Sequence, residues 1–252
     1  MKTILITGCS SGFGLETARH FFERGFRVIA TMRTPREDVL PRSERARVLA
    51  LDVTDPESIR QAVEAAGPID ALVNNAGVGI MSVLEGTSLE AARALFEINT
   101  FGAMAVTQAF LPQLRERKGG VIVNVSSSVT LRALPLLSVY SASKAALNAF
   151  TESLAFELEP FDVRVRLVLP GRSPDTAFPQ NAMAQVQSHG VVVPDAYADF
   201  TRGVFERMAG APPGPLTRPV DVAEAVWRAV NDPSSPLRQP AGADAVEWAR
   251  SS

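Results

Sequence analysis

Continuous apolar runs recur along the chain, and segments with the periodicity of helices separate them. A strand with one face in water alternates apolar and polar residues, whereas a strand covered by helices on both faces is apolar throughout. Runs of the second kind are typical of central strands in a parallel sheet. The sequence therefore predicts an α/β fold, a doubly wound, Rossmann-like parallel sheet in a single domain. The expected strands are residues 3–7, 27–32, 47–51, 71–73, 121–125 and 163–169.

Two long helical patterns follow the fourth and fifth expected strands. The first covers residues 88–117 and is expected to bend near Gly102 or Pro112, since both residue types interrupt regular helices. The second covers residues 138–157. The Pro-rich stretch at residues 233–240 is interpreted as a closing loop, because proline is poorly suited to the interior of helices and strands.

The segment 172–217 interrupts the alternation of strands and helices. It is rich in Pro, Gly, Met and Phe, with only weak helical stretches around residues 182–187 and 196–208. Long irregular segments in a small domain are commonly binding loops or lids. We interpret this segment as an insertion that covers a substrate site.

Composition and charge exclude several classes of protein. The chain has 252 residues, 25 basic and 27 acidic, and therefore a formal net charge of −2. Neither a nucleic acid nor an anionic membrane surface is an expected partner. With 46% hydrophobic and 21% charged residues the chain is typical of a soluble globular protein. It shows no export signal and no apolar run approaching the roughly 20 residues that span a bilayer, so a cytoplasmic location is expected.

Cysteine and histidine are too scarce for several kinds of site. Cys9 is the single cysteine, and His20 and His189 are the two histidines. No internal disulfide and no four-ligand Cys/His zinc site can form, and we expect no bound metal. A Ser-His-Asp hydrolase would have to use one of these histidines, and His20 lies in a helical pattern where a surface role is expected. Hydrolysis by a triad is therefore disfavoured.

A glycine-rich turn follows the first expected strand and leads into a helical pattern. Gly8, Gly12 and Gly14 are spaced G-x-x-x-G-x-G. Glycine allows a positive φ and a close approach of the backbone to a pyrophosphate, and the following helix N-terminus offers free N–H groups. The turn alone is equally compatible with a structural βα connection. If it binds phosphate, the residues of the turn that contact it also include Ser10, Ser11 and Phe13.

Five motifs occur in the order typical of one enzyme family. They are Thr7-Gly8-(x)3-Gly12-x-Gly14, Asn74-Asn75-Ala76-Gly77, Ser127, Tyr140-(x)3-Lys144 and Pro170-Gly171. In this set the chain resembles the short-chain dehydrogenase/reductase family, specifically from residue 3 to about 171 and more loosely beyond. The glycine turn and residues 30–33 are similar to the branch that contains hydroxysteroid and retinol dehydrogenases. The resemblance implies an NAD(P)-dependent alcohol or carbonyl oxidoreductase.

The catalytic residues implied by this resemblance are Asn99, Ser127, Tyr140 and Lys144. Tyr140 and Lys144 are four residues apart and share one face of the expected helix. The pKa of a free phenol is about 10, and a neighbouring ammonium favours the phenolate, so we expect Lys144 to lower the pKa of Tyr140. Ser127 stands at the family's interval of thirteen residues before Tyr140 and would bond the substrate oxygen, although Ser126 and Ser128 adjoin it. The resemblance also implies that Asn99 holds a water linking Lys144 to solvent.

Further cofactor contacts follow from the resemblance. Asp52 and Val53 would flank the adenine, and Asn75, Ala76 and Gly77 would run along the ribose, because ligands of open parallel sheets bind beyond the carboxyl ends of strands. Asp52 is equally consistent with a cap preceding a helix. The remaining contacts implied are Tyr140, Lys144, Pro170, Gly171 and Thr176.

The chain departs from the family pattern after Pro170-Gly171. The family usually has a threonine five residues after that proline, which holds the nicotinamide carboxamide, whereas here position 175 is Asp and Thr176 follows it. Either the loop is longer by one residue and Thr176 still reaches the ring, or that contact is lost and another group replaces it.

The second expected strand ends without a carboxylate. An NAD-specific site places Asp or Glu there to accept hydrogen bonds from the ribose 2′-OH. Here the strand ends at Arg33, whose planar guanidinium suits a phosphate, and Ser11 could add a hydroxyl. The sequence favours NADP(H) over NAD(H), the alternative being a solvated Arg33 and an indifferent site.

The leading functional hypothesis is an NADP(H)-dependent oxidoreductase that interconverts a secondary alcohol and a ketone. The alternative is a dinucleotide-binding sensor or scaffold with little or no turnover. A bulky apolar substrate is expected, because the candidate lining is apolar, unless those side chains only pack the lid onto the sheet. The candidate lining residues are Val78, Ile80, Met81, Leu134, Leu136, Val139 and the lid residues 173–210.

A homodimer or homotetramer is implied by the resemblance, since the family pairs the helices at 88–117 and 138–157. Ala146, Phe150, Leu154 and Phe156 are apolar positions that could serve such a surface, although core packing explains some of them equally well.

Overall fold

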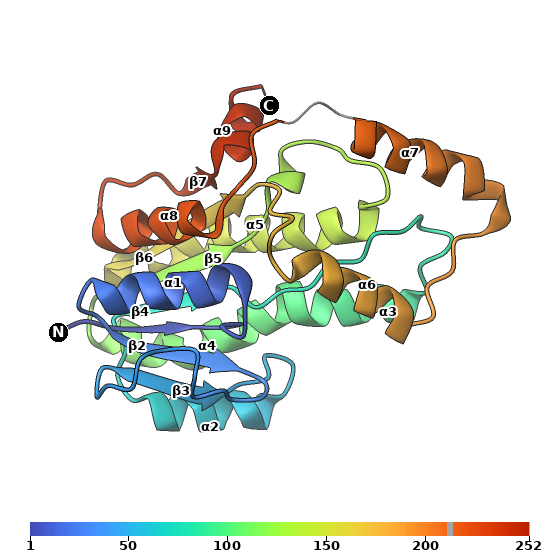
Figure 1. Ribbon diagram of the computed structural model, residues 1–252. Helices are drawn as coiled ribbons and strands as arrows, with labels where there is room; N and C mark the ends of the chain where they lie inside the picture. Colours follow the sequence, from blue (N-terminus) through green and yellow to red (C-terminus); the bar gives the residue numbers. More distant parts are fainter. Residues whose placement is uncertain (211–213, 252) are drawn as a thin grey trace.

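Seven parallel strands form one sheet in the order β3-β2-β1-β4-β5-β6-β7 (Figure 1). The computed structural model describes residues 1–210 and 214–251. The doubly wound α/β fold expected from the sequence is confirmed. The strands are β1 Thr3–Ile6, β2 Arg27–Met32, β3 Ala46–Ala50, β4 Ala71–Asn74, β5 Gly120–Val125, β6 Val163–Pro170 and β7 Arg238–Ala241.

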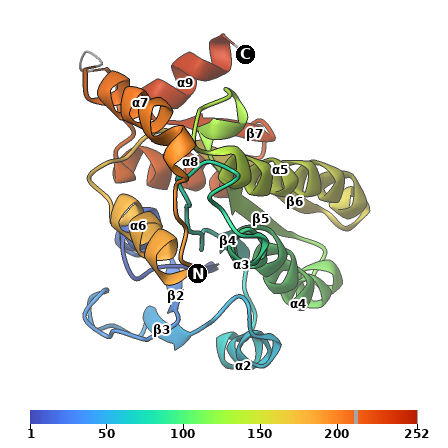
Figure 2. The same cartoon turned by 90° about the vertical axis from the view of Figure 1, so that its right-hand side faces the viewer.

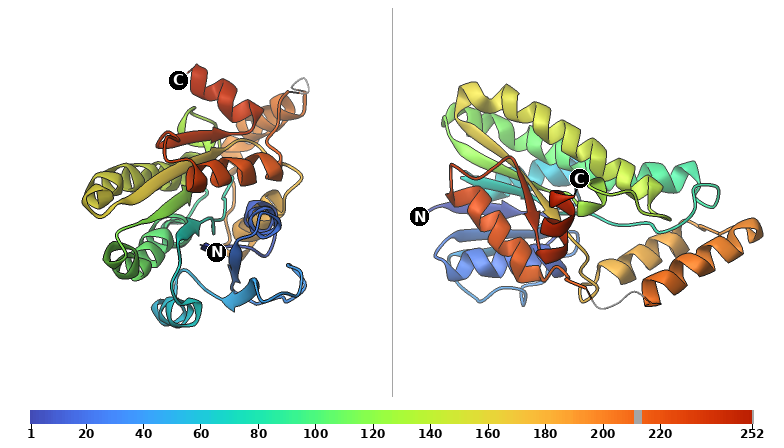
Figure 3. Two further views of the ribbon diagram at one scale, coloured as in Figure 1. Left: turned by 90° about the vertical axis from the view of Figure 1, so that its left-hand side faces the viewer. Right: turned by 90° about the horizontal axis from the view of Figure 1, so that it is seen from above.

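Helices cover both faces of the sheet (Figure 3). In β1, Ile4 and Ile6 pack against one set of helices while Leu5 packs against the other, which explains why the strand is apolar at every position. Helices α1 Gly12–Glu23 and α8 Pro219–Asn231 cover the first face; α2 Pro56–Ala66, α4 Ala103–Glu116 and α5 Ser138–Leu158 cover the second.

The long helical pattern after β4 is interrupted once. Helix α3, Leu89–Phe96, passes into a π-helical turn, Glu97–Gly102, which continues as α4. The π-helical turn ends at Gly102, one of the two positions where the sequence predicts a bend, and Pro112, the other, lies within α4. Single π-turns inside helices are frequent at functional sites, and this one contains Asn99.

Two expectations about the C-terminal half and the first helix are wrong. The stretch interpreted as a closing loop contributes β7, in which Pro240 pairs in register with Leu169. Proline is tolerated there because β7 is an edge strand and needs no second partner. His20 is buried rather than at the surface, since α1 packs along α8, where His20 meets Glu224 at 3.1 Å and the ring of Trp227.

The described part of the segment 172–217 contains two α-helices, α6 Phe178–Ser188 and α7 Ala198–Gly210. Helix α6 is longer than the stretch 182–187 seen in the sequence, whereas α7 is shifted by two residues from 196–208. Both helices lie beyond the carboxyl ends of the strands (Figure 1 and Figure 2). Residues 211–213 of the segment lie outside the described residues. The chain ends with α9, Ala243–Arg250. Within the part of the chain that the structure describes, no helix is both long and apolar enough to cross a membrane.

Candidate active site

The glycine turn between β1 and α1 has the backbone geometry that its sequence indicates. Gly8 and Gly12 have φ values of 73° and 58°, which disfavour any side chain. A methyl group on Gly14 would collide with the Asn75 side chain and the carbonyl of Gly8. Glycine at these positions therefore lets the turn approach the loop after β4 closely.

Thr7 fastens the turn after β1 to the turn after β4. Its hydroxyl oxygen accepts hydrogen bonds from the backbone N–H of Asn75 at 2.9 Å and of Ala76 at 3.0 Å. The Asn75 amide donates in return to the carbonyls of Thr7 at 2.9 Å and Gly8 at 3.2 Å. Sequence reasoning did not assign a role to Thr7. Its position directly after β1, where the turns after parallel strands meet, could have indicated one.

A cavity of about 370 Å³ opens at the carboxyl edge of the sheet. It brings together residues from the turns after β1 to β4 and from the start of α6, and most of the predicted cofactor residues line it. Those residues are Gly8, Ser10, Ser11, Gly12, Phe13, Arg33, Asp52, Val53, Asn75, Ala76, Gly77 and Thr176. Thr54 and Ile98, which sequence reasoning missed, also line the cavity, as do four residues predicted for the substrate lining or the lid: Val78, Phe178, Asn181 and Gln185.

Five predicted cofactor residues do not line this cavity: Gly14, Tyr140, Lys144, Pro170 and Gly171. Gly14 packs beneath the turn, as its contact with Asn75 shows. The backbone N–H of Gly171 donates to the Thr217 hydroxyl at 2.9 Å and to the carbonyl of Ala241 at 3.2 Å, so it anchors the start of the 172–217 segment to β7.

Charged side chains at the rim of this cavity differ in how they are paired. Arg33 has no hydrogen-bond or ion-pair partner among residues 1–210 and 214–251. Arg36, which sequence reasoning missed, donates to the backbone carbonyl of Ser10 at 3.3 Å. The Asp52 carboxylate accepts from the N–H and hydroxyl of Thr54 at 2.9 and 2.7 Å, and Asp55 rather than Asp52 caps α2. Arg33 is thus the free cation of this group.

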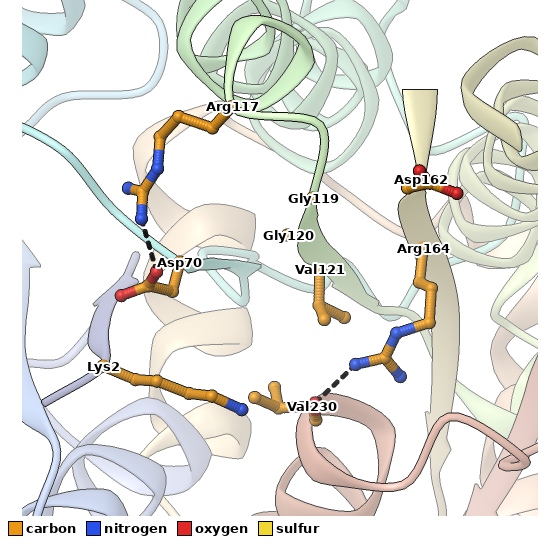
Figure 4. A pocket seen from close by; sticks show the side chains of 9 residues that line it. All are labelled: Lys2, Asp70, Arg117, Gly119, Gly120, Val121, Asp162, Arg164 and Val230. Carbon is orange, nitrogen blue, oxygen red and sulfur yellow. Dashed lines mark hydrogen bonds and ion pairs between the residues drawn. The ribbon is translucent and has the colours of Figure 1, made fainter. Parts of the chain in front are cut away.

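A second cavity, of about 230 Å³, lies at the opposite, amino-terminal edge of the sheet (Figure 4). Its arginines already have protein partners. Arg117 donates to Asp70 at 2.8 Å, and Arg164 donates to the carbonyl of Val230 at 2.7 Å. These contacts join loops to the end of α8. They lie at the opposite end of the strands from the cavity lined by the glycine turn.

Tyr140, Lys144 and Ser127 come together where β5 ends against α5. Tyr140 and Lys144 are one helical turn apart, and all three side chains are buried. Ser127 is hydrogen-bonded to the Tyr140 side chain. The hydroxyl of Ser126 instead donates to the backbone carbonyl of Lys144 at 3.3 Å, and the Lys144 ammonium donates to the carbonyl of Val125 at 3.2 Å. Of the two, Ser127 is the serine directed at Tyr140.

Burial decides the acidity of both ionisable groups. It raises the pKa of Tyr140 to about 12, because removal from water opposes the phenolate more than the Ser127 hydrogen bond favours it. The sequence-based expectation of a lowered pKa is therefore wrong. Burial also lowers the pKa of Lys144 to about 8. Burial thus shifts both side chains toward their uncharged forms, but with a pKa of about 8 Lys144 is still mostly charged at pH 7.

Asn99 joins the loop after β4 to α5. Its side chain accepts from the N–H of Val78 and donates to the carbonyl of Val78, both at 2.9 Å, and it donates to the Ser143 hydroxyl at 3.1 Å. Ser143 donates in turn to the carbonyl of Tyr140 at 2.8 Å. Sequence reasoning missed Ser143, which lies directly before Lys144. The water-holding role of Asn99 stays a prediction.

Gly77 leaves the loop open toward these polar groups. A methyl group there would lie 3.2 Å from both Asn99 Oδ1 and Lys144 Nζ. The loop after β4, which lines the cleft, thus passes directly beside Asn99 and Lys144 at a residue that has no side chain.

Thr176 reaches the cleft despite its displacement by one position. It is buried, whereas Asp175 is exposed, and its Cβ would lie 3.6 Å from a methyl group on Gly12. Its hydroxyl donates to the carbonyl of Ser173 at 2.9 Å and accepts from the N–H of Phe178 at 3.3 Å. These contacts favour a loop longer by one residue, and the nicotinamide contact stays a prediction.

The apolar residues predicted to line a substrate pocket mostly join the lid to the body. Ile80 packs with Tyr140, while Met81 and Leu136 pack with Val204 of α7. Val78 and Val139 are partly buried in the same cluster as Ile80, and Leu134 is half-buried. Packing of the lid therefore accounts for much of this apolar character.

Comparison with known proteins identifies the family. The model of the family described as short chain dehydrogenase matches residues 2–187. The chain belongs to the short-chain dehydrogenase family. Members of this family are oxidoreductases that bind a nicotinamide dinucleotide and act on small molecules. The family assignment covers the glycine turn, all four catalytic candidates and the start of the 172–217 segment.

Three similar proteins show how far the likeness extends. Retinol dehydrogenase 8 of Bos taurus is 35% identical over 261 residues, covering 94% of this chain and 80% of that protein. A 3-ketodihydrosphingosine reductase of Bacteroides thetaiotaomicron is 41% identical over 174 residues, 68% of this chain, and the match spans 63% of that protein. A short-chain dehydrogenase from Burkholderia cenocepacia, solved in complex with NADP, has a TM-score of 0.75 and 31% identity, covering 99% of this chain and 94% of that chain.

The burial of Lys144 predicts an unusual pH dependence. Lys144→Met should abolish turnover yet raise the Tm at pH 7 by about 2 °C or more, because an apolar side chain replaces a buried ammonium. The pKa of Lys144 is lowered to about 8, so between pH 8 and about 10.5 the unfolded chain binds a proton that the folded chain has released. The wild type should therefore gain stability relative to the variant across that window.

Calorimetry of both proteins from pH 7 to 10 measures this difference. A Tm difference between the Met variant and the wild type that narrows with rising pH agrees with a buried lysine whose charge opposes folding. A Met variant less stable than the wild type at pH 7 would show instead that the ammonium stabilises the fold.

Proposed function

We propose that this protein is an NADP(H)-dependent oxidoreductase that interconverts a secondary alcohol and a ketone. The observation that carries the proposal is the contact of Ser127 with Tyr140 beside Lys144, at the edge of a cleft lined by the glycine turn. Residues of this cleft fit a dinucleotide, since the glycine turn lines it and α1 begins at that turn with no side-chain cap on its N-terminus.

The bound nicotinamide would supply or accept the hydride. Tyr140 would hold the proton at its phenolic oxygen and exchange it with the substrate oxygen. Ser127 would donate a hydrogen bond to the same oxygen, where negative charge develops on reduction. Lys144 would place a positive charge beside Tyr140, and Asn99 would hold α5 in register with the loop after β4. The raised pKa of Tyr140 suits a proton donor in the reduction of a ketone.

Removal of the Tyr140 hydroxyl tests the catalytic assignment. Tyr140→Phe should reduce kcat by about 10²- to 10⁴-fold or more, because the general acid is lost, while the ring still packs. The dissociation constant for NADPH, measured by fluorescence titration, should stay within a few-fold of wild type. Retention of more than about a tenth of the wild-type kcat would rule out Tyr140 as the proton donor.

The preference for NADP(H) rests on Arg33. This guanidinium lies at the rim of the cleft with no partner among the described residues, and Ser11 lies in the same lining. A planar cation with free donors suits the 2′-phosphate that distinguishes NADP from NAD. The solved structure from Burkholderia cenocepacia contains NADP, which agrees with this proposal.

Charge reversal at position 33 tests the cofactor preference. Arg33→Asp should lower the preference for NADPH over NADH by about 1.5–3 kcal/mol, the scale of a charged hydrogen bond, while NADH binding is largely kept. The measurement is kcat/KM for each cofactor with one ketone. A wild-type enzyme that is more efficient with NADH than with NADPH would contradict the assignment.

A bulky, largely apolar carbonyl or alcohol is the proposed substrate. Val78 lines the cleft and the lid carries Phe178 at its entrance. Two similar proteins are named for retinol and for 3-ketodihydrosphingosine. We expect a higher kcat/KM for alicyclic or aromatic ketones than for small charged keto acids. The opposite ranking in a substrate panel would contradict an apolar pocket.

The same panel distinguishes the alternative function. A dinucleotide-binding sensor or scaffold would bind NADPH yet oxidise none of it with any ketone, as followed by the absorbance of the reduced nicotinamide. A cytoplasmic location stays a prediction from the sequence.

We further propose a homodimer or homotetramer formed through α4 and α5. Phe156 on α5 and Phe101 in the π-helical turn before α4 are 76% and 51% exposed, which is unusual for such large apolar groups. Leu154 cannot contribute, because it is buried in the core beneath α5, and Phe150 is partly buried there. Light scattering at micromolar concentration should give at least twice the monomer mass, and Phe156→Asp should lower it. A monomer mass for the wild type would refute the proposal.

A further inference from the structure

Phe178, the first residue of α6, lies against the candidate proton donor. Its ring centroid is 5.7 Å from that of Tyr140, with the two ring planes inclined by 55°. The same side chain lines the cofactor cleft, whereas Tyr140 does not. Phe178 therefore stands between the cleft and the face of Tyr140 that α6 covers.

The Phe178 ring packs directly on Gly79, which we call the seat of the ring. A methyl group on Gly79 would lie 2.7 Å from Cζ and 3.0 Å from Cε1 of Phe178, closer than side chains approach each other. The φ of Gly79 lies outside the left-handed region, unlike that of Gly8 or Gly12, so its backbone does not demand glycine. Glycine at position 79 instead leaves the space that the Phe178 ring occupies.

The position of this ring limits access to Tyr140. Tyr140 is 6% exposed and Ser127 is 8% exposed, so neither hydroxyl is open to a large molecule in this arrangement. A ketone must bring its oxygen to both groups, and any bulky substituent directed toward α6 meets the Phe178 ring. Phe178 itself is 38% exposed, which leaves the ring an outward path.

We propose that Phe178 is a specificity-determining residue that limits the size of the substituent accepted beside Tyr140. The ring rests on Gly79 and Tyr140, and larger substrates must displace it before their oxygen reaches Tyr140 and Ser127. This inference rests on the proposed oxidoreductase function and adds to it the residue that sets the size limit.

The experiment compares two ketones, cyclohexanone and the fused bicyclic 1-decalone, with NADPH as the reductant. In the wild type the ratio of kcat/KM for decalone to that for cyclohexanone defines the size preference. Phe178→Ala should raise this ratio by about ten-fold or more, the scale of steric discrimination in apolar pockets, and Phe178→Leu should give an intermediate value. Phe205→Ala, an equivalent change at a half-exposed ring of α7, should leave the ratio within two-fold of wild type.

A double-mutant cycle tests the seat of the ring. Gly79→Ala should change the ratio in the wild-type background, where the new methyl group collides with the ring. It should have little effect in the Phe178→Ala background, where the collision is removed. Equal effects of Gly79→Ala in both backgrounds would overturn the proposed seat.

The outcomes separate this inference from the proposed function. Turnover of both ketones by the wild type, with a ratio that Phe178→Ala leaves unchanged or lowers, overturns the role of Phe178 alone. No turnover of either ketone by the wild type or by any variant overturns the oxidoreductase proposal, and the size limit with it.

Discussion

The side chain of Asn99 makes the connection on which the geometry of the site depends. Its oxygen and both its N–H groups are used, toward the N–H and carbonyl of Val78 and the hydroxyl of Ser143. Because buried polar networks that are fully satisfied are rigid, these bonds fix α5 relative to the loop after β4. Tyr140 and Lys144 are placed by α5, and the cofactor cleft by that loop. The π-helical turn that carries Asn99 is the local irregularity that serves this connection.

Burial of Tyr140 and Lys144 accompanies this packing, and it changes the chemistry expected of the pair. A charge argument alone predicts that Lys144 lowers the pKa of Tyr140. Desolvation dominates here instead: it raises the pKa of Tyr140 to about 12, against the Ser127 hydrogen bond, and lowers that of Lys144 to about 8. The protein thus holds a protonated phenol ready to donate. Negative charge brought in by a bound dinucleotide would favour the charged form of Lys144, which links cofactor binding to the state of the pair.

The parts of the molecule that sequence could predict are those set by short-range patterns. Strand runs, the glycine turn and the Tyr-x-x-x-Lys spacing depend on neighbours within about one helical turn or strand, and the structure contains each strand and helix predicted from them. The burial of His20, the pairing of β7 and the Phe178 seat depend on residues distant in the chain. Thr7 and Ser143 were missed for the same reason, since their hydroxyls act on other strands and helices.

Two contacts between the 172–217 segment and the body separate the proposed chemistry from the proposed substrate selection. Thr176 rests near Gly12 and Phe178 rests on Gly79, so at both points a glycine of the sheet edge receives a side chain of the lid. The catalytic candidates stand on β5 and α5, and their hydrogen bonds go to the body rather than to α6. A substitution at position 178 can therefore reshape the space above Tyr140 without loosening the groups beneath it. In the function proposed here, selectivity and proton transfer are carried by different elements, and the Phe178 ring of one lies against the Tyr140 ring of the other.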